Sequence, residues 1–123
     1  MSYIDGFLLA VPKANREKFI EFAAFIDPLF LELGATRVVE CWGDELPEGK
    51  LTDFYKAVNA KEDETVTLAW VEWPDKETRA QGQKRMHELA QSGDDRFDED
   101  KHPVPFDGVR MVTGGFSMVF EVE

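Results

Sequence analysis

The first strand predicted along this chain, residues 3–11, is apolar on both of its faces. Side chains alternate along a strand, which places Tyr3, Phe7, Leu9 and Val11 on one face and Ile4, Leu8 and Ala10 on the other. A strand with two apolar faces has to be covered on both sides. A sheet that contains it therefore needs two covering layers, and this requirement limits the folds that the chain can adopt.

The first predicted helix can supply part of one layer. It starts near Asn15, a residue that suits the N-cap, and stops before Gly34, which suits the position after a helix end. Its apolar residues recur at helical spacing: Phe19, Phe22, Ala23, Ile26, Leu29, Phe30 and Leu33. Pro28 lies inside this pattern. Because proline lacks a backbone N–H and clashes with the preceding turn, we expect a kink or a break near Ile26 and Asp27.

A second helix is predicted over residues 76–91, with Asp75 as its N-cap. Gly82 lies inside it and should weaken the helix by about 1 kcal/mol relative to alanine. The residues expected to be buried are Ala80, Met86, Leu89 and Ala90. This helix is poorer in apolar residues than the first.

Three further strands are predicted, over residues 36–42, 65–73 and 109–120. The middle one, T-V-T-L-A-W-V-E-W, is the strongest strand in the chain because it is rich in β-branched and aromatic residues. Gly114 and Gly115 interrupt the last strand and indicate a bulge or a close backbone approach.

The segments between these elements are predicted to be turns and loops. Residues 43–50 have turn chemistry, residues 61–64 form a charged hairpin loop, and residues 92–108 form an acidic loop. Residues 52–60 fit either a helical turn or a short edge strand, and we expect an extended segment.

The order strand, helix, strand, strand, helix, strand is that of the split βαβ unit of ferredoxin-like folds (βαββαβ). This α+β arrangement has an antiparallel sheet with both helices on one face. The other face carries apolar groups and must find cover elsewhere. A second copy of the chain is the simplest cover, packed sheet against sheet about a two-fold axis. We therefore predict a homodimer of chains that each form a single domain over residues 1–123.

The charge of the chain limits its partners. It has 25 acidic and 14 basic residues among 123, a net charge of −11. Such a surface repels phosphate backbones and anionic lipid, so we expect neither nucleic acid nor a membrane as a partner. The N-terminal residues lack a basic start, and their apolar run stops at Pro12, which is typical of neither a signal peptide nor a membrane span. We expect a cytoplasmic protein.

Five carboxylates lie in or beside the predicted strands: Asp5, Glu40, Asp44, Asp53 and Glu72. The predicted sheet can gather some of them in one cavity with Trp42, Trp70 and Arg110. A buried carboxyl group beside apolar rings has a raised pKa and can act as a general acid or base. We predict Glu40 or Glu72 in that role, with Arg110 holding an anionic substrate. The alternative is an Arg–Glu pair that only fixes the register of the sheet or of the dimer.

Aromatic side chains are candidates for pocket walls or for interface anchors. The residues expected at a pocket or at the interface are Tyr3, Trp42, Asp44, Asp53, Trp70 and Trp73. No metal site is predicted, because His87 and His102 lack the spacing of a ligand pair, and no cofactor is expected. Cys41, the only cysteine, lies mid-strand and is expected to be a small buried hydrophobe.

Long stretches of this chain resemble the YbaA-like conserved bacterial proteins of unknown function. The resemblance rests on Y-I-D-G-F-L-L-A-V-P-K-A-N, G-A-T-R-V-V-E-C-W-G-D, G-K-L-T-D-F, V-E-W-P-D-K-E-T-R and P-F-D-G-V-R-M-V-T-G-G-F. It implies the dimeric α/β-barrel superfamily, whose protomers are ferredoxin-like and whose sheets pair. That superfamily includes cofactor-independent monooxygenases, lactone isomerases, haem-degrading enzymes and small stress-responsive proteins, so it does not fix a function. Residues 94–102 are longer and more acidic than this family's pattern.

Three functions remain open from the sequence. The first is binding of a small molecule in a pocket lined by the sheet. The second is a cofactor-free enzyme, similar to a monooxygenase or an isomerase, that acts on a small organic compound. The third is an interaction module whose polar strand residues only set the register of the dimer. An enzyme requires a cavity that reaches Glu40 or Glu72, and this requirement separates the hypotheses.

Overall fold

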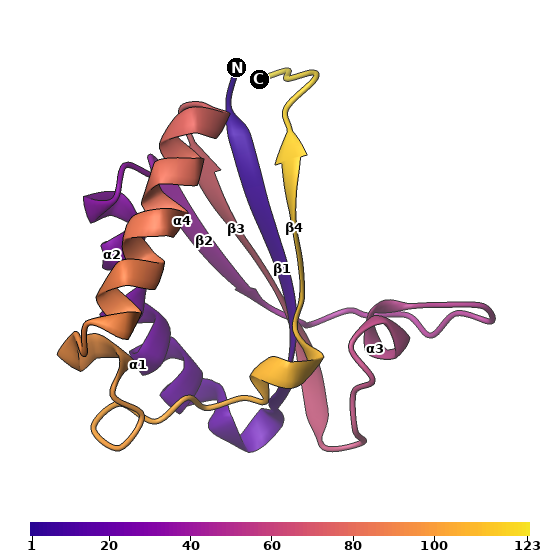
Figure 1. Ribbon diagram of the computed structural model, residues 1–123. Helices are drawn as coiled ribbons and strands as arrows, with labels where there is room; N and C mark the ends of the chain where they lie inside the picture. Colours follow the sequence, from indigo (N-terminus) through magenta and orange to yellow (C-terminus); the bar gives the residue numbers. More distant parts are fainter.

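The computed structural model describes residues 1–123 and shows a four-stranded antiparallel sheet with its long helices on one side (Figure 1). The strands are β1 (Tyr3–Pro12), β2 (Arg37–Trp42), β3 (Glu64–Trp73) and β4 (Val112–Ser117), in the spatial order β2-β3-β1-β4. The helices are α1 (Arg16–Ile26), α2 (Pro28–Glu32), α3 (Phe54–Ala57) and α4 (Lys76–Gln91). Short 3-10 turns lie before α1 (Lys13–Asn15), after α4 (Asp95–Phe97) and before β4 (Gly108–Arg110). The predicted α+β class and the antiparallel sheet are confirmed. None of the helices combines the length and the apolar character needed to cross a membrane.

Pro28 divides the first predicted helix in two, as expected from its missing N–H. α1 ends at Ile26 and α2 begins at Pro28, and Gly34 follows with a left-handed φ of +112°. Asn15 occupies the N-cap position of α1, but its side chain does not cap the helix. Its amide donates instead to the carbonyl oxygen of Pro105 at 3.0 Å. This bond ties the start of α1 to the long loop that precedes β4.

α4 has the predicted bounds but is more exposed than predicted. Asp75 caps it by accepting a hydrogen bond from the backbone N–H of Thr78 at 2.7 Å. Four residues were expected to be buried. Ala80 and Ala90 are exposed, and Met86 and Leu89 are half-buried. The one buried residue of the helix is Gly82. A Cβ at this position would lie 2.6 Å from the indole ring of Trp73, so the glycine allows the helix to approach the sheet.

Replacing Gly82 by alanine is expected to destabilise the fold by about 1–3 kcal/mol, although alanine is the better helix former. Trp73 is 1% exposed and its indole donates to Asp5 at 2.9 Å, so the ring cannot move aside. Thermal unfolding measures the effect. Ala80→Gly on the exposed side of α4 is the control and should lower stability only by the usual about 1 kcal/mol. A rise in Tm for Gly82→Ala would contradict the close contact.

Residues 52–60, predicted to be extended, instead contain the short helix α3. Asp53 accepts a hydrogen bond from the backbone N–H of Lys56 at 2.7 Å and so caps this helix. Glu64, predicted in a hairpin loop, is the first residue of β3 and is buried. The Asp53 cap is a local signal that the prediction for residues 52–60 did not use, whereas Glu64 is held by Arg110, which lies 46 residues away in the sequence.

The last strand is shorter than predicted and has no bulge. Its ladder with β1 runs without interruption through Gly114 and Gly115. The bulge expected for this pair is therefore wrong. Gly115 instead makes room for a side chain, because a Cβ at this residue would lie 2.5 Å from the hydroxyl oxygen of Tyr3. Residues 109 and 110 belong to a 3-10 turn, and residues 118–120 lie beyond the strand.

The sheet has a covered face and an open face. α1, α2 and α4 pack over the covered face, whose buried clusters include Leu9, Val11, Phe19, Val71 and Trp73. The opposite side, which we call the open face, carries apolar side chains from all four strands: Ile4, Leu8, Val39, Cys41, Leu68, Trp70, Val112 and Phe116. Three of them are 42–61% exposed, and α3 covers only one end of this face. A single chain therefore leaves the predicted second covering layer unfilled.

Candidate functional site

Two carboxyl groups meet where β2 faces the break between α1 and α2. Glu40 lies on the covered face of β2, because it is opposite Ala69 in the register with β3. Asp27 is the single residue between α1 and α2, and its carboxyl group hydrogen-bonds with that of Glu40. A hydrogen bond between two carboxyl groups requires that one of them carries a proton. We call these two residues the acid pair.

The surroundings of the acid pair place that proton on Glu40. The Glu40 side chain is partly exposed to the groove, and the desolvation of its carboxyl group against α1 raises its pKa to about 8. The hydrogen bond and the charge of Asp27 act in the same direction. Burial also raises the pKa of Asp27, while the hydrogen bond from Glu40 opposes this shift. Near neutral pH, Glu40 therefore donates its proton to the Asp27 carboxylate. A protonated carboxyl group at neutral pH is the form that a general acid requires.

The acid pair makes stability depend on pH. The pKa of Glu40 rises from 4.5 to about 8 on folding, so between these values the folded chain binds more protons than the unfolded chain. The contribution of Glu40 is therefore complete below pH 4.5 and is lost as the pH rises through about 8. We expect the Tm of the wild type to fall, relative to that of Glu40→Gln, between about pH 5 and about pH 9. A Tm difference that does not change with pH would contradict the raised pKa.

The acid pair lies between an open groove and a smaller cavity. The groove has a volume of about 750 Å³ and runs between β2 and the two helices α1 and α2. The cavity, of about 120 Å³, lies between α1 and the sheet. Five residues line both spaces: Phe19, Ala23, Asp27, Val38 and Glu40. The carboxyl groups are thus available to a molecule that occupies the groove.

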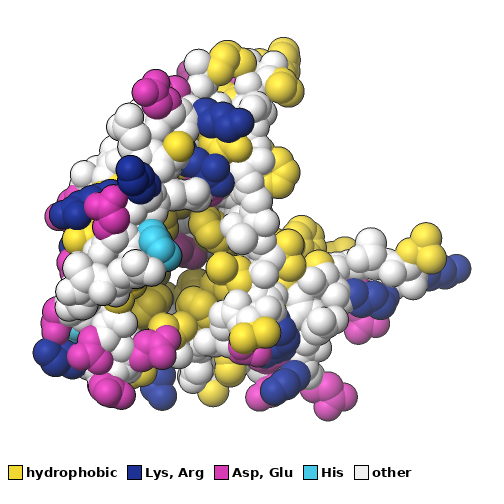
Figure 2. All heavy atoms as spheres, in the orientation of Figure 1, with side chains coloured by type: hydrophobic (Ala, Val, Ile, Leu, Met, Phe, Trp, Pro, Cys, Tyr) yellow, Lys and Arg dark blue, Asp and Glu magenta, His cyan; other side chains and the backbone are white.

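Aromatic rings and arginines surround the acid pair. Trp42 packs against Phe19 with ring centroids 5.8 Å apart, and the Arg16 guanidinium lies 6.0 Å from the centroid of Trp42. Arg37 lines the groove from the opposite end of β2. Phe106, from the loop before β4, packs edge-on against Phe19 at 6.2 Å and also lines the cavity. Figure 2 shows hydrophobic side chains inside the hollow between the helices and the sheet.

The structure separates residues that the sequence placed in one cavity. Glu40 and Trp42 line the groove. Glu72 and Trp70 lie on the open face, where the Trp70 indole donates to Glu72 at 2.9 Å. Glu72 also pairs with Arg37 at 3.3 Å, the kind of Arg–Glu pair that we named as the alternative. Arg37 both lines the groove and joins the cluster on the open face.

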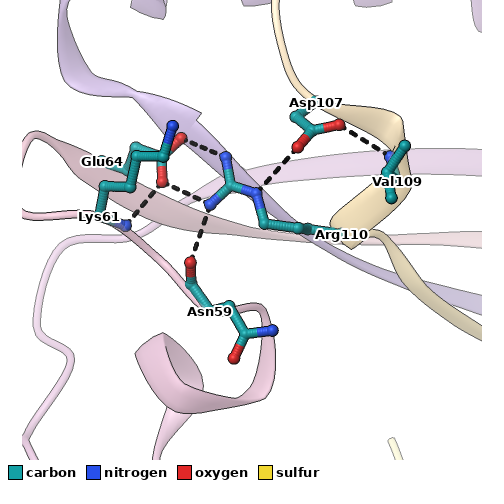
Figure 3. Close-up of polar contacts among 6 residues, drawn as sticks. All are labelled: Asn59, Lys61, Glu64, Asp107, Val109 and Arg110. Carbon is teal, nitrogen blue, oxygen red and sulfur yellow. Dashed lines mark hydrogen bonds and ion pairs between the residues drawn. The ribbon is translucent and has the colours of Figure 1, made fainter.

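Arg110 lines neither the groove nor the cavity, so the prediction that it joins Glu40 is wrong. Its guanidinium donates to both carboxylate oxygens of Glu64 at 2.7 Å each, to Asp107 at 3.1 Å and to the carbonyl oxygen of Asn59 at 2.9 Å (Figure 3). The bonds from Arg110 lower the pKa of Glu64 to about 2. The cluster joins the start of β3 to the turn before β4, and sequence reasoning missed it because Glu64 was assigned to a loop.

Trp73 and Tyr3 belong to a second buried cluster beneath α4. The Asp5 carboxylate accepts from the Trp73 indole at 2.9 Å and from Arg79 at 2.8 Å. The Arg79 guanidinium also lies 5.1 Å from the centroid of the Tyr3 ring. These contacts satisfy the buried carboxylate and hold α4 on the sheet.

The remaining predicted site residues, Asp44 and Asp53, lie in the segment between β2 and β3. Asp44 is exposed, and Asp53 accepts hydrogen bonds from two backbone N–H groups. Neither lines the groove. No three histidine, cysteine, aspartate or glutamate side chains are grouped as metal ligands.

Asp27 is the site residue that sequence reasoning misses. It was assigned only to the expected helix break before Pro28. The spacing of Asp27 could have identified it as a site residue. Asp27 follows Phe19 by eight residues and Ala23 by four, so it falls on the apolar face of α1. A carboxylate on an apolar helix face is rarely buried without a partner. The partner, Glu40, becomes visible only when β2 is placed beside the helix.

Comparisons with known proteins agree on the family and the fold. Residues 2–108 match the family described as a protein of unknown function, DUF1428. The uncharacterized protein YbaA of Escherichia coli (strain K12) is 46% identical over 122 residues, with 98% of this chain and 99% of that protein covered, and YbaA of Shigella flexneri gives the same values. A solved dimeric ferredoxin-like protein from an uncultured marine organism superimposes with a TM-score of 0.57 at 12% identity, with 98% of each chain covered. This likeness confirms the ferredoxin-like fold.

Proposed function

Because the chain belongs to the DUF1428 family, whose function is unknown, we propose a function from its own groove: the protein binds a small organic molecule over the acid pair. The observation that supports this proposal is the carboxyl pair of Asp27 and Glu40, which shares a proton and lines a largely apolar groove of about 750 Å³. Small-molecule sites typically have volumes of about 300–1,000 Å³ and combine apolar walls with a few polar groups. The groove fits this description.

The groove residues favour a particular ligand chemistry. The acid pair offers one O–H donor and several acceptor oxygens, which suits a hydroxyl or carbonyl group. Trp42 and Phe19 offer apolar ring surfaces beside the pair. Arg16 and Arg37 line the groove near opposite ends of β2 and favour an anionic group. We therefore propose a small aromatic or apolar compound that carries an oxygen function and a carboxylate.

Native mass spectrometry of the gently purified protein tests this proposal. We expect a small molecule to be retained by the wild type and to be lost in Ala24→Trp, since Ala24 is exposed and lines only the groove. Ala80→Trp is the matched control, because it places the same side chain on an exposed position of α4. A bound mass that survives Ala24→Trp, or a wild type without any bound mass, would count against the groove as the site.

A second candidate function is acid–base catalysis without a cofactor. The observation that favours it is the raised pKa of Glu40, which holds a proton at neutral pH next to a groove. In this case Glu40→Gln keeps the shape of the site and retains the ligand, but abolishes its conversion. If the protein only binds its ligand, neither the wild type nor the variant converts it. Product analysis after incubation with the retained molecule separates the two functions.

We also propose that the protein pairs with a second copy through the open face. The support is the row of apolar side chains on that face, together with the dimeric state named for the similar solved structure. The cluster of Arg37, Glu72 and Trp70 lies at the border of this face. Polar groups in such a position fix the register of two packed sheets.

A further inference from the structure

A projecting arm stands at one end of the open face. The arm comprises residues 43–63 between β2 and β3, and Figure 1 shows it extending away from the sheet on the side opposite the long helices. Its base packs on the open face through Val58, which contacts Ala10 and Val66. Within the arm, Leu51 is 96% exposed and Phe54 is 43% exposed. The single chain leaves both apolar side chains uncovered, together with the apolar side chains of the open face.

The arm is braced by its own hydrogen bonds. The Asp53 carboxylate accepts from the backbone N–H groups of Gly49 and Lys56 at 3.0 and 2.7 Å. The Lys56 ammonium donates back to the carbonyl oxygen of Gly49. These bonds hold the turn before Leu51 in one shape. A preformed arm loses little conformational entropy when a partner binds it.

An apolar tail lies at the opposite corner of the same face. The tail comprises residues 118–123, which continue from β4 beyond its last pair with β1. These residues belong to no strand, and Val119 among them is 85% exposed. Phe120 and Val122 are each 81% exposed. The one backbone bond that holds this segment runs from Met118 N–H to the carbonyl oxygen of Ser2 at 3.2 Å.

We infer that the arm of one copy receives the tail of its partner, so that two reciprocal contacts frame the paired sheets. The arm lies at the β2–β3 corner where β1 ends, and the tail lies at the β4 corner where β1 begins. A two-fold axis that crosses the line between these corners at right angles brings each arm onto the partner's tail. One symmetry operation then covers Leu51, Phe120 and Val122 together. This inference rests on the proposed pairing of open faces.

Charge disfavours a contact between two tails. The tail carries Glu121 and Glu123, so two tails placed side by side would bring four negative charges together, counting two from each copy. Like charges repel across an interface. The arm offers Lys50 directly beside Leu51, but with six acidic and three basic residues it is acidic as a whole. The contact between arm and tail is therefore carried by the apolar side chains, with Lys50 as the one adjacent positive charge.

Cysteine cross-linking tests the inference in the full-length chain. In a Cys41→Ser background, we expect Leu51→Cys/Phe120→Cys to give a covalent dimer with a short bis-maleimide. We expect neither single variant to do so alone, whereas a mixture of the two single variants should give a cross-linked heterodimer. Covalent dimers from Leu51→Cys alone, or from Phe120→Cys alone, would show like-to-like contacts and overturn the inference.

Sedimentation velocity on the same samples distinguishes the two ways of failing. A dimer that the double variant does not cross-link overturns the arm-and-tail contact and leaves the pairing of open faces intact. If the wild type and the Cys41→Ser background both sediment as monomers, the arm-and-tail contact and the pairing of open faces are both overturned. If the inference holds, removal of residues 119–123 should also raise the dimer dissociation constant by roughly tenfold or more, as loss of a large apolar contact does.

Discussion

Replacing Arg110 by methionine is expected to cost about 3 kcal/mol of stability, because it leaves the Glu64 carboxylate buried without its charged partner. Only the backbone N–H of Lys61, at 2.7 Å, then still donates to this carboxylate. The Glu64 side chain is only 4% exposed and accepts two bonds from Arg110 at 2.7 Å. Chemical denaturation at neutral pH measures the loss. The matched control is the double variant Arg110→Met/Glu64→Gln, which removes the carboxylate as well as its partner. It should be more stable than Arg110→Met alone, since no charge is then left buried.

The same cluster predicts an acid response. The pKa of Glu64 falls from 4.5 to about 2 on folding, so its contribution to stability is complete above pH 4.5 and is lost as the pH falls toward 2. In Arg110→Met the contribution is already absent, so its stability should fall less over this range. Parallel acid curves for the wild type and Arg110→Met would contradict the assignment of this pair.

Replacing Leu68 by glutamate is expected to convert the proposed dimer into a monomer. Leu68 lies on β3 in the open face and is 43% exposed in the single chain. A carboxylate buried between two apolar sheets costs several kcal/mol, which corresponds to a rise in the dissociation constant of roughly a hundredfold or more. Sedimentation equilibrium measures this constant.

Ile20→Glu is the control for that experiment. Ile20 is 46% exposed, close to the value for Leu68, but it lies on α1 on the other side of the sheet. It should leave the dimer unchanged. If Leu68→Glu and Ile20→Glu behave alike, the open face is not the interface.

Local chemistry made much of the fold predictable from the sequence. Asp75, Pro28 and Gly34 act on the backbone within a few residues, so the start of α4, the break after α1 and the end of α2 follow directly from them. The apolar residues on both faces of β1 likewise predict a second face that needs cover and that the long helices leave open. Such features depend on neighbours in sequence rather than on the final packing.

Contacts between distant segments account for what the sequence did not reveal. Glu40 was identified because a carboxylate in a strand is unusual, but its partner Asp27 is 13 residues away and meets it only through the packing of α1 on β2. The local sequence around Glu64 predicts a charged loop, and its role depends on Arg110, which lies 46 residues later in the sequence and donates to it. The local sequence around Gly82 predicts a weakened helix, and its role depends on the indole ring of Trp73 that packs against it. Each of these residues has a local pattern that favours a different role.

The titration of Glu40 tests the central claim most directly. Carbon-13 NMR of the side-chain carboxyl groups, followed from pH 3 to pH 10 or about that range, reports the protonation of each acid separately. The acid pair predicts that Glu40 titrates near pH 8 and that Asp27→Asn moves this value down toward the ordinary range, because the charge of Asp27 is then removed. A Glu40 signal that titrates near 4.5 in the wild type would contradict the proton-sharing pair and, with it, the function proposed for the groove.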